Sequence, residues 1–132
     1  MRGRSAAAGL LAASVLAAGC GAEEFPNDPR PPAPVELSAK VDDRKVTVVP
    51  DEVGAGLATF TISNQSRDGV ELAFDGPSDI RTDVIPAGGV GAVQFELEPG
   101  TYEIEAGVPT IADGAMTVGP ERPSASNELL LP

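Results

Sequence analysis

Hydrophobic and polar residues alternate with a period of two along most of the chain from Val35 to Val118, and no segment shows a convincing helical period. Successive side chains of a strand point to opposite faces of a sheet, so this alternation predicts strands with one buried face. The positions expected to face inward are Val35, Leu37, Ala39 and Val41; Ala58, Phe60 and Ile62; Val70, Leu72 and Phe74; Val93, Phe95 and Leu97; and Tyr102, Ile104 and Ala106. With Val46–Val49, Ala115–Val118 and a weaker candidate at Ile80–Ile85, the count is seven or eight short strands, which is typical of an all-β sandwich.

Turn-forming residues separate the expected strands. The turns are predicted at 42–45, 54–56 (Gly-Ala-Gly), 64–69, 75–78, 86–89 and 99–100, where Gly, Pro, Asn, Asp and Ser gather. Pro50 is expected to end the strand Val46–Val49. Tyr102 follows the Pro99-Gly100 turn, and its hydroxyl is expected to anchor the corner between neighbouring strands.

The order of these motifs resembles the cupredoxin fold. The resemblance rests on Val46-x-Val48-x-Pro50, an Ala-Gly turn, Phe60-Thr61-Ile62-Ser63-Asn64, Ile85-Pro86-Ala87-Gly88 and Leu97-Glu98-Pro99-Gly100-Thr101-Tyr102. It covers Val35 to Val118 and implies a Greek-key β-sandwich over residues 35–119.

The same resemblance implies positions for copper ligands, and this sequence departs from them. Type 1 copper is held by two His, one Cys and usually a Met, but the chain has no His. Val70 and Ala106 stand near the positions of the first His and the Cys, and the loop from Gly107 to Gly114 offers no His. Met116 lies near the axial position but is expected in the core. We therefore expect no copper and no metal ligand.

The N-terminus has the pattern of an export signal that ends in a lipidated cysteine. Arg2 and Arg4 precede an uncharged segment from Ser5 to Gly19, which is shorter than a membrane span. The stretch Leu16-Ala17-Ala18-Gly19-Cys20 resembles the lipobox of bacterial lipoproteins, which implies cleavage before Cys20 and attachment of lipid to its thiol. The alternative is an ordinary secretory signal, with Cys20 free or removed.

Processing at Cys20 predicts a signal peptide over 1–19, a lipidated Pro-rich tether over 20–34, the β-domain over 35–119 and a tail over 120–132. The formal charge changes from −11 to −13, because residues 1–19 hold two Arg and no Asp or Glu. Such acidity argues against nucleic acid and against adsorption on anionic lipid, so the acyl chains must hold the protein at the membrane. We expect it on the extracytoplasmic face of the cell membrane.

Carboxylates occur in pairs, but a site is predicted only weakly. Glu96 and Glu98, and Glu103 and Glu105, have the spacing of an outer strand face, and a solvated acidic face is the simplest interpretation. Asp75, Ser78, Asp79 and Asp83 are the alternative, as oxygen ligands for calcium, although their spacing matches no recognised calcium loop. Without His, triads and His-ligated zinc are excluded, and we expect no enzyme and no cofactor.

The chain ends with Leu129-Leu130-Leu131-Pro132, which is unusual for a polar tail. Either these leucines fold back onto a sheet edge, or they dock on a partner by strand addition. The sequence as a whole favours a lipid-anchored binding or accessory domain, with an envelope protein as a possible partner. The alternative is a metal-handling envelope protein that uses carboxylates and Met116.

Overall fold

The computed structural model describes residues 30–124, which form eight β-strands. They are β1 (Val35–Val41), β2 (Val46–Val49), β3 (Glu52–Asn64), β4 (Ala73–Asp75), β5 (Ile80–Arg81), β6 (Val90–Leu97), β7 (Gly100–Glu105) and β8 (Gly114–Glu121). The predicted all-β class and the count of seven or eight strands are confirmed. The predicted signal peptide, Cys20, the first part of the tether and Leu129–Leu131 lie outside the described residues.

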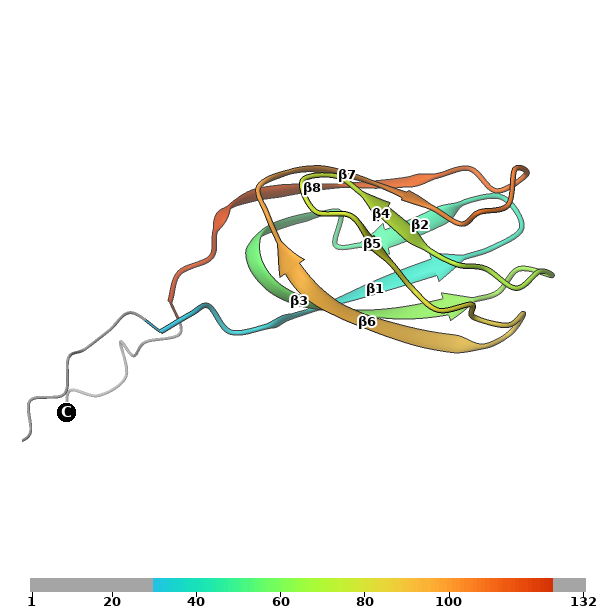
Figure 1. Cartoon of the computed structure of the whole chain (residues 1–132), viewed down its shortest axis with the longest axis horizontal. Coiled ribbons are helices and arrows are strands. Elements are labelled where there is room, and N and C mark those ends of the chain that lie inside the picture. The colour runs from blue at the N-terminus through green and yellow to red at the C-terminus, as the bar shows by residue number, and fades with distance from the viewer. Residues whose placement is uncertain (1–29, 125–132) are drawn as a thin grey trace, which may run out of the picture.

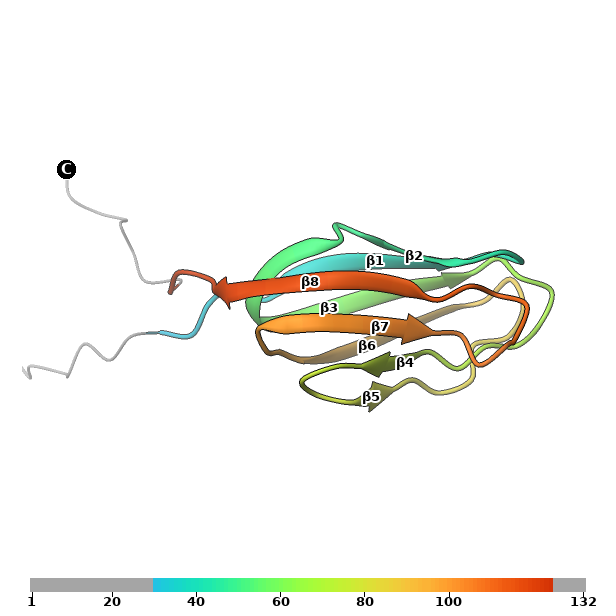
Figure 2. The same ribbon diagram turned by 90° about the horizontal axis from the view of Figure 1, so that it is seen from above.

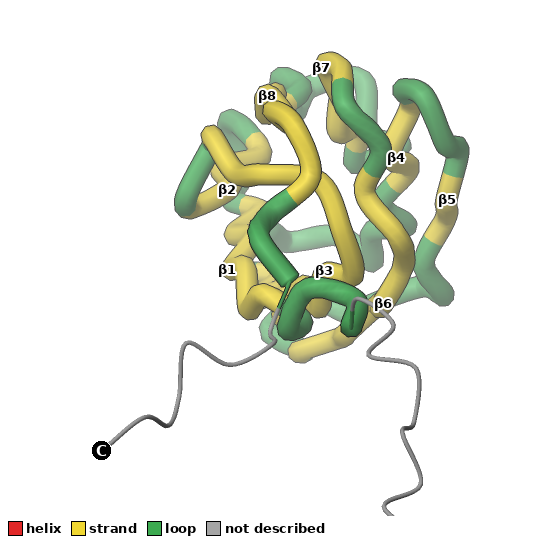
Figure 3. Tube along the Cα trace, turned by 90° about the vertical axis from the view of Figure 1, so that its left-hand side faces the viewer, coloured by secondary structure: helices red, strands yellow, loops and turns green. Residues whose placement is uncertain are grey.

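The strands form two sheets that share β3 (Figures 1 and 2). The first sheet has the order β2-β1-β3-β6, in which β1 runs parallel to β3 and the other pairs are antiparallel. The second has the order β3-β8-β7-β4-β5, in which the beginning of β3 runs parallel to β8. Because β3 passes from one sheet to the other, the strands surround a single core (Figure 3).

The core is built from the inward positions of the alternating pattern. Ala58, Phe60 and Ile62 of β3 are fully buried, as are Tyr102 and Ile104 of β7. The ring centroid of Phe60 lies 4.8 Å from that of Phe74 and 5.5 Å from that of Phe95. Such distances are favourable for aromatic pairs, so a few rings fill the centre while aliphatic side chains fill the rest.

The predicted turn at Gly54-Ala55-Gly56 is wrong, because these residues lie inside β3. Gly54 pairs with Gly119 of β8, and the register shifts between Gly54 and Ala55, so the strand bends here as it changes sheets. A Cβ on Gly54 would lie 2.6 Å from Cγ of Arg122. The glycines therefore leave space for the Arg122 side chain, and the chain does not reverse here.

Three strand boundaries differ from those expected from the alternation. β4 begins only at Ala73, although Val70 and Leu72 are buried as predicted. Val70 instead forms an isolated bridge with Ile85, so the predicted strand Ile80–Ile85 is reduced to β5 and this bridge. β8 continues to Glu121, two residues past the predicted end of the domain at 119.

Both ends of the described chain lie at the same end of the sandwich (Figure 1). The Ser124 hydroxyl donates a hydrogen bond to the carbonyl of Arg30. Pro32, in the segment predicted as tether, is buried. The N–H of Arg122 donates to the carbonyl of Ala55, and its Nη2 donates to the carbonyl of Leu57 at 2.6 Å. The first residues of the tail are thus held against β3, and Ser124 links them to Arg30 of the tether.

Candidate functional site

The positions at which the cupredoxin resemblance implies copper ligands are occupied by buried aliphatic residues. Val70 is 1% exposed and Ala106 is 2% exposed. The structure brings the two segments together, because a Cβ on Gly107 would lie 3.7 Å from the carbonyl oxygen of Glu71. The aliphatic side chains of Val70 and Ala106 cannot donate to copper.

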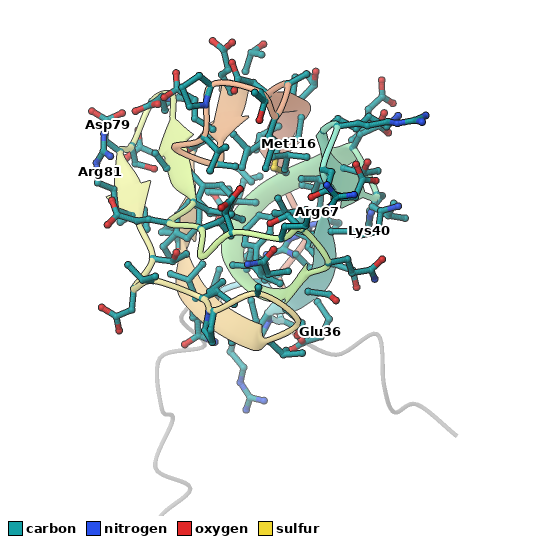
Figure 4. The ribbon with its side chains drawn as sticks, turned by 90° about the vertical axis from the view of Figure 1, so that its right-hand side faces the viewer. Glu36, Lys40, Arg67, Asp79, Arg81 and Met116 are labelled. Carbon is teal, nitrogen blue, oxygen red and sulfur yellow. The ribbon has the colours of Figure 1, made fainter. Side chains whose placement is uncertain are left out.

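Met116 lies inside the sandwich, where Figure 4 shows it between the two sheets. It is 2% exposed and pairs in register with Tyr102. Its thioether therefore packs in the core and does not face a hollow in which a cation could be held.

The loop between β7 and β8 borders a hollow of about 390 Å³, which is lined by Glu105, Gly107, Val108, Pro109, Ile111, Ala112 and Asp113. Glu105 and Asp113 are its only charged lining residues. Among residues 30–124, no three side chains of His, Cys, Asp or Glu come together as metal ligands would.

In the acidic loop predicted as a calcium candidate (Asp75, Ser78, Asp79 and Asp83), the oxygen atoms with assigned hydrogen bonds have different partners. An Oδ1 of Asp79 accepts the N–H of Gly76 at 3.3 Å, which closes a turn. The Ser78 hydroxyl lies 2.8 Å from that of Tyr102. Asp83 follows β5, and its carbonyl accepts the Thr82 hydroxyl. The structure therefore does not gather these residues around one point.

The outer face of the second sheet carries four carboxylates, which belong to β3, β4 and β7. Asp75 of β4 stands directly opposite Glu103 of β7, and Glu105 stands opposite Ala73. Glu52 of β3 shares the face through its pairing with Thr117 of β8, which is also the partner of Thr101. We call Glu52, Asp75, Glu103 and Glu105 the acidic face.

The acidic face has little compensating positive charge. None of the salt bridges within residues 30–124 involves its four carboxylates. Arg81 stands opposite Ala73 but pairs with Glu71 at 3.5 Å. Like charges directly opposite each other in a sheet destabilise it by tenths of a kcal/mol.

The outer face of the first sheet is chemically different. Ser38, Thr61 and Ser63 point outward from β1 and β3 beside Thr59, whose hydroxyl accepts Nε2 of Gln94 at 2.9 Å. We call Ser38, Thr59, Thr61, Ser63 and Gln94 the hydroxyl face. This face also carries Glu36 and Lys40 of β1 and Glu96 of β6, so it mixes hydroxyl groups with charges of both signs.

Asp42 is the titratable group with a clear shift. Its Oδ1 accepts the N–H groups of Arg44 at 2.9 Å and Lys45 at 3.0 Å, and its Oδ2 lies 3.2 Å from Nζ of Lys40. The two backbone bonds, and then Lys40, lower the pKa of Asp42 from 3.8 to about 2. The carboxylate closes the turn between β1 and β2, which is a structural role.

Asn64 is a buried polar residue whose role the sequence analysis missed. Its Nδ2 donates to the carbonyls of Asp68 at 2.8 Å and Ile85 at 2.9 Å, and its Oδ1 accepts from the backbone and hydroxyl of Ser66. It therefore ties the loop after β3 to the segment before β6. An Asn before a Ser at a strand end signals a turn, but not this distant contact.

The part of the chain that the structure describes contains no helix long and apolar enough to cross a membrane.

No family model matches the sequence, and no curated protein matches it. Solved structures similar to the chain include a Na-dithionite reduced auracyanin from the photosynthetic bacterium Roseiflexus castenholzii, with 17% identity and a TM-score of 0.47 over 68% of this chain and 99% of auracyanin. A multicopper oxidase has 13% identity and a TM-score of 0.47 over 74% of this chain and 46% of the oxidase. Lac15 from a marine microbial metagenome has 18% identity and a TM-score of 0.42 over 72% of this chain and 34% of Lac15. This chain therefore covers less than half of the length of the multicopper oxidase and of Lac15.

Proposed function

We propose that the protein is a lipid-anchored, extracytoplasmic binding module with a cupredoxin-like sandwich, and that its acidic face binds a positively charged envelope protein. The observation that carries the proposal is the placement of Asp75 opposite Glu103. A pair of like charges that weakens the sheet becomes favourable when a cationic surface covers it.

The arrangement of the ends supports a tethered module. The Pro-rich segment before β1 and the start of the tail meet at one end of the sandwich, through Ser124 and Arg30. The acidic face belongs to strands of the second sheet. These strands run lengthwise along the sandwich from that end (Figure 2). A domain held by lipid at Cys20 would therefore present this face sideways to neighbouring envelope proteins.

The alternative, a metal-handling protein that uses carboxylates and Met116, receives less support. Met116 is buried in the core, the side chains of Ser78 and Asp79 make separate hydrogen bonds, and no three acidic side chains gather among residues 30–124. Type 1 copper would require donors that Val70 and Ala106 do not supply.

Capture from cross-linked envelopes tests the proposed function. Full-length wild-type protein is compared with Glu103→Gln/Glu105→Gln and with Glu36→Gln, which removes an exposed carboxylate from the other sheet. We expect the double variant to lose a basic partner that wild type and Glu36→Gln retain, and we expect raised salt to weaken binding in detergent extracts. The proposal fails if all three forms capture the same proteins.

A further inference from the structure

The outer face of the first sheet carries exposed apolar side chains at both of its margins. Val49 of β2 is 61% exposed and Val90 of β6 is 69% exposed, and they are two of the three exposed large hydrophobic residues among residues 30–124. Both lie on this face, because Val49 pairs with Ser38 and Val90 pairs with Ser63 of the hydroxyl face. The side chains between them are mostly short, so another flat surface can approach closely.

Two opposite charges lie symmetrically about the middle of this face. Glu36 and Lys40 are both exposed on β1, two residues before and two residues after Ser38. About 13 Å of strand separates them, so they do not pair within one molecule. Glu36 has no salt bridge within the described part of the chain, and Lys40 has one, to Asp42 at 3.2 Å, with its side chain still 46% exposed. Both charges are therefore accessible to another molecule.

A second copy of the chain matches this pattern. When two copies meet face to face about a two-fold axis that crosses β1 at Ser38, perpendicular to the strand, their β1 strands run antiparallel. Glu36 of each copy then lies opposite Lys40 of the other. The two Val49 side chains also oppose each other, because Val49 is level with Ser38 on the neighbouring strand. Packed sheets lie about 10 Å apart, a distance that a Lys and a Glu side chain span together.

The strands of this face set no like charges against each other in such a pair. Ala92 of β6 is level with Thr61, and Thr61 is level with Ser38. Glu96, four residues after Ala92, would therefore meet the uncharged residues just before Val90 of the other copy. Two acidic faces, by contrast, would oppose carboxylates to carboxylates, which disfavours association there.

The size of the face predicts a weak dimer. Its four strands are about 19 Å wide and the seven residues of β1 are about 24 Å long, which gives about 450 Å² per copy. Stable interfaces bury about 800 Å² per partner. We therefore expect a reversible dimer that forms in concentrated protein.

We propose that the hydroxyl face is a homodimer interface, on which two copies pack antiparallel with reciprocal Glu36–Lys40 pairs. Both acidic faces stay exposed on the outside of the pair. The two tethers would leave at opposite ends, and fifteen extended residues, 20–34, span about 46 Å, which is enough for both to reach a membrane along which the pair lies. The inference concerns the sheet opposite the acidic face and does not depend on the proposed function.

Sedimentation of the purified full-length protein in detergent, from about 10 µM to about 1 mM and at about 0.15 M salt, tests the pairing. We expect the wild type to pass from monomer to dimer over this range. Glu36→Lys and Lys40→Glu should each weaken the dimer about tenfold or more, because two attractive pairs become two repulsive ones. A wild type that stays monomeric at the highest concentration would overturn the proposal.

A mixture of the two variants identifies the contact. In a pair of one Glu36→Lys chain and one Lys40→Glu chain, both contacts again join opposite charges. An equimolar mixture should recover dimerisation to within about threefold of wild type, which unfolded variants could not do. Glu103→Gln/Glu105→Gln is the control from the other sheet and should dimerise like wild type. Failure of the mixture to recover, or loss of the dimer in the control, would also overturn the proposed interface.

Discussion

The hydroxyl groups of Tyr102 and Ser78 lie 2.8 Å apart, deep beside the turn that joins β6 to β7. The same Tyr102 oxygen accepts the N–H of Glu98 at 3.1 Å. Tyr102 is fully buried, so its hydroxyl fastens the β4–β5 loop and the β6–β7 turn to the second sheet. The anchoring role predicted for this residue is confirmed, and its partner in the β4–β5 loop is an additional finding.

We expect Tyr102→Phe to lower the free energy of unfolding by about 1–3 kcal/mol, because the N–H of Glu98 and the hydroxyl of Ser78 lose their shared partner. Urea denaturation measures this change. Ser78→Ala should cost less, because the bond from Glu98 remains. Equal stability of Tyr102→Phe and wild type would show that water replaces the lost bonds.

Asn64→Ala should lower the free energy of unfolding by about 3–4 kcal/mol. Four side-chain hydrogen bonds are lost in a buried site, at about 1 kcal/mol each. Gln65→Ala is the control, because Gln65 is the exposed neighbour. Thermal unfolding of both variants gives the comparison. A similar, small decrease in melting temperature in both variants would contradict the role assigned to Asn64.

Gly54→Ala is expected to destabilise the fold by about 1–3 kcal/mol through overpacking, because the new methyl would lie 2.6 Å from Cγ of Arg122 and 2.9 Å from the carbonyl oxygen of Pro120. Its partner across the sheet supplies the control. A Cβ on Gly119 would lie 3.9 Å from the nearest atom, the carbonyl oxygen of Val53. Chemical denaturation should therefore leave Gly119→Ala much closer to wild type, and the reverse order would be evidence against this packing.

The lowered pKa of Asp42 predicts a specific pH dependence of stability. Its pKa is lowered in the folded state from 3.8 to about 2, so it stabilises the fold above pH 3.8, and this contribution is lost as the pH falls through 3.8 toward 2. The difference in melting temperature between wild type and Asp42→Ala should thus shrink over that interval. A difference that stays constant from pH 6 to pH 2 would show that the carboxylate charge does not matter.

Cys20→Ala should release the protein from the membrane fraction and leave the β-domain folded, because the lipid is expected on this thiol. Fractionation followed by circular dichroism measures both properties. The Arg122→Lys variant, altered at the start of the tail, should stay in the membrane fraction. Continued tight association of Cys20→Ala would contradict the proposed anchor.

The alternating pattern was sufficient to predict the strands because burial in a sandwich follows the period of the strand. Leu37, Ala39 and Val41 are buried where predicted, and Val93, Phe95 and Leu97 lie on β6 as expected. Glycine was the main source of error. A Gly-Ala-Gly stretch favours a turn locally, but here Gly54 makes room for Arg122, 68 residues further along the chain, and such a distant contact leaves no local trace.

The candidate site could be predicted only in part, for a related physical reason. The spacing of Glu103 and Glu105 correctly placed them on an outer face. Which other carboxylates share that face depends on the register between strands, which sets Asp75 opposite Glu103 and places Glu52 on the same face, two strands away from β7 and beside Thr117 of β8. Pairing between strands far apart in the sequence is not encoded in any single segment.

The parallel pairing of β1 with β3 determines how the domain would bear mechanical load. β1 is the strand that follows the tether, and it is paired with β3 along seven consecutive positions, from Val35 to Val41. A pull on the tether acts along this strand, so the hydrogen bonds on both of its edges are loaded together in shear and not opened one by one. A domain attached in this way would resist extraction by a partner that moves relative to the membrane, because the tether leads into a strand that β3 holds from Val35 and β2 holds from Ser38.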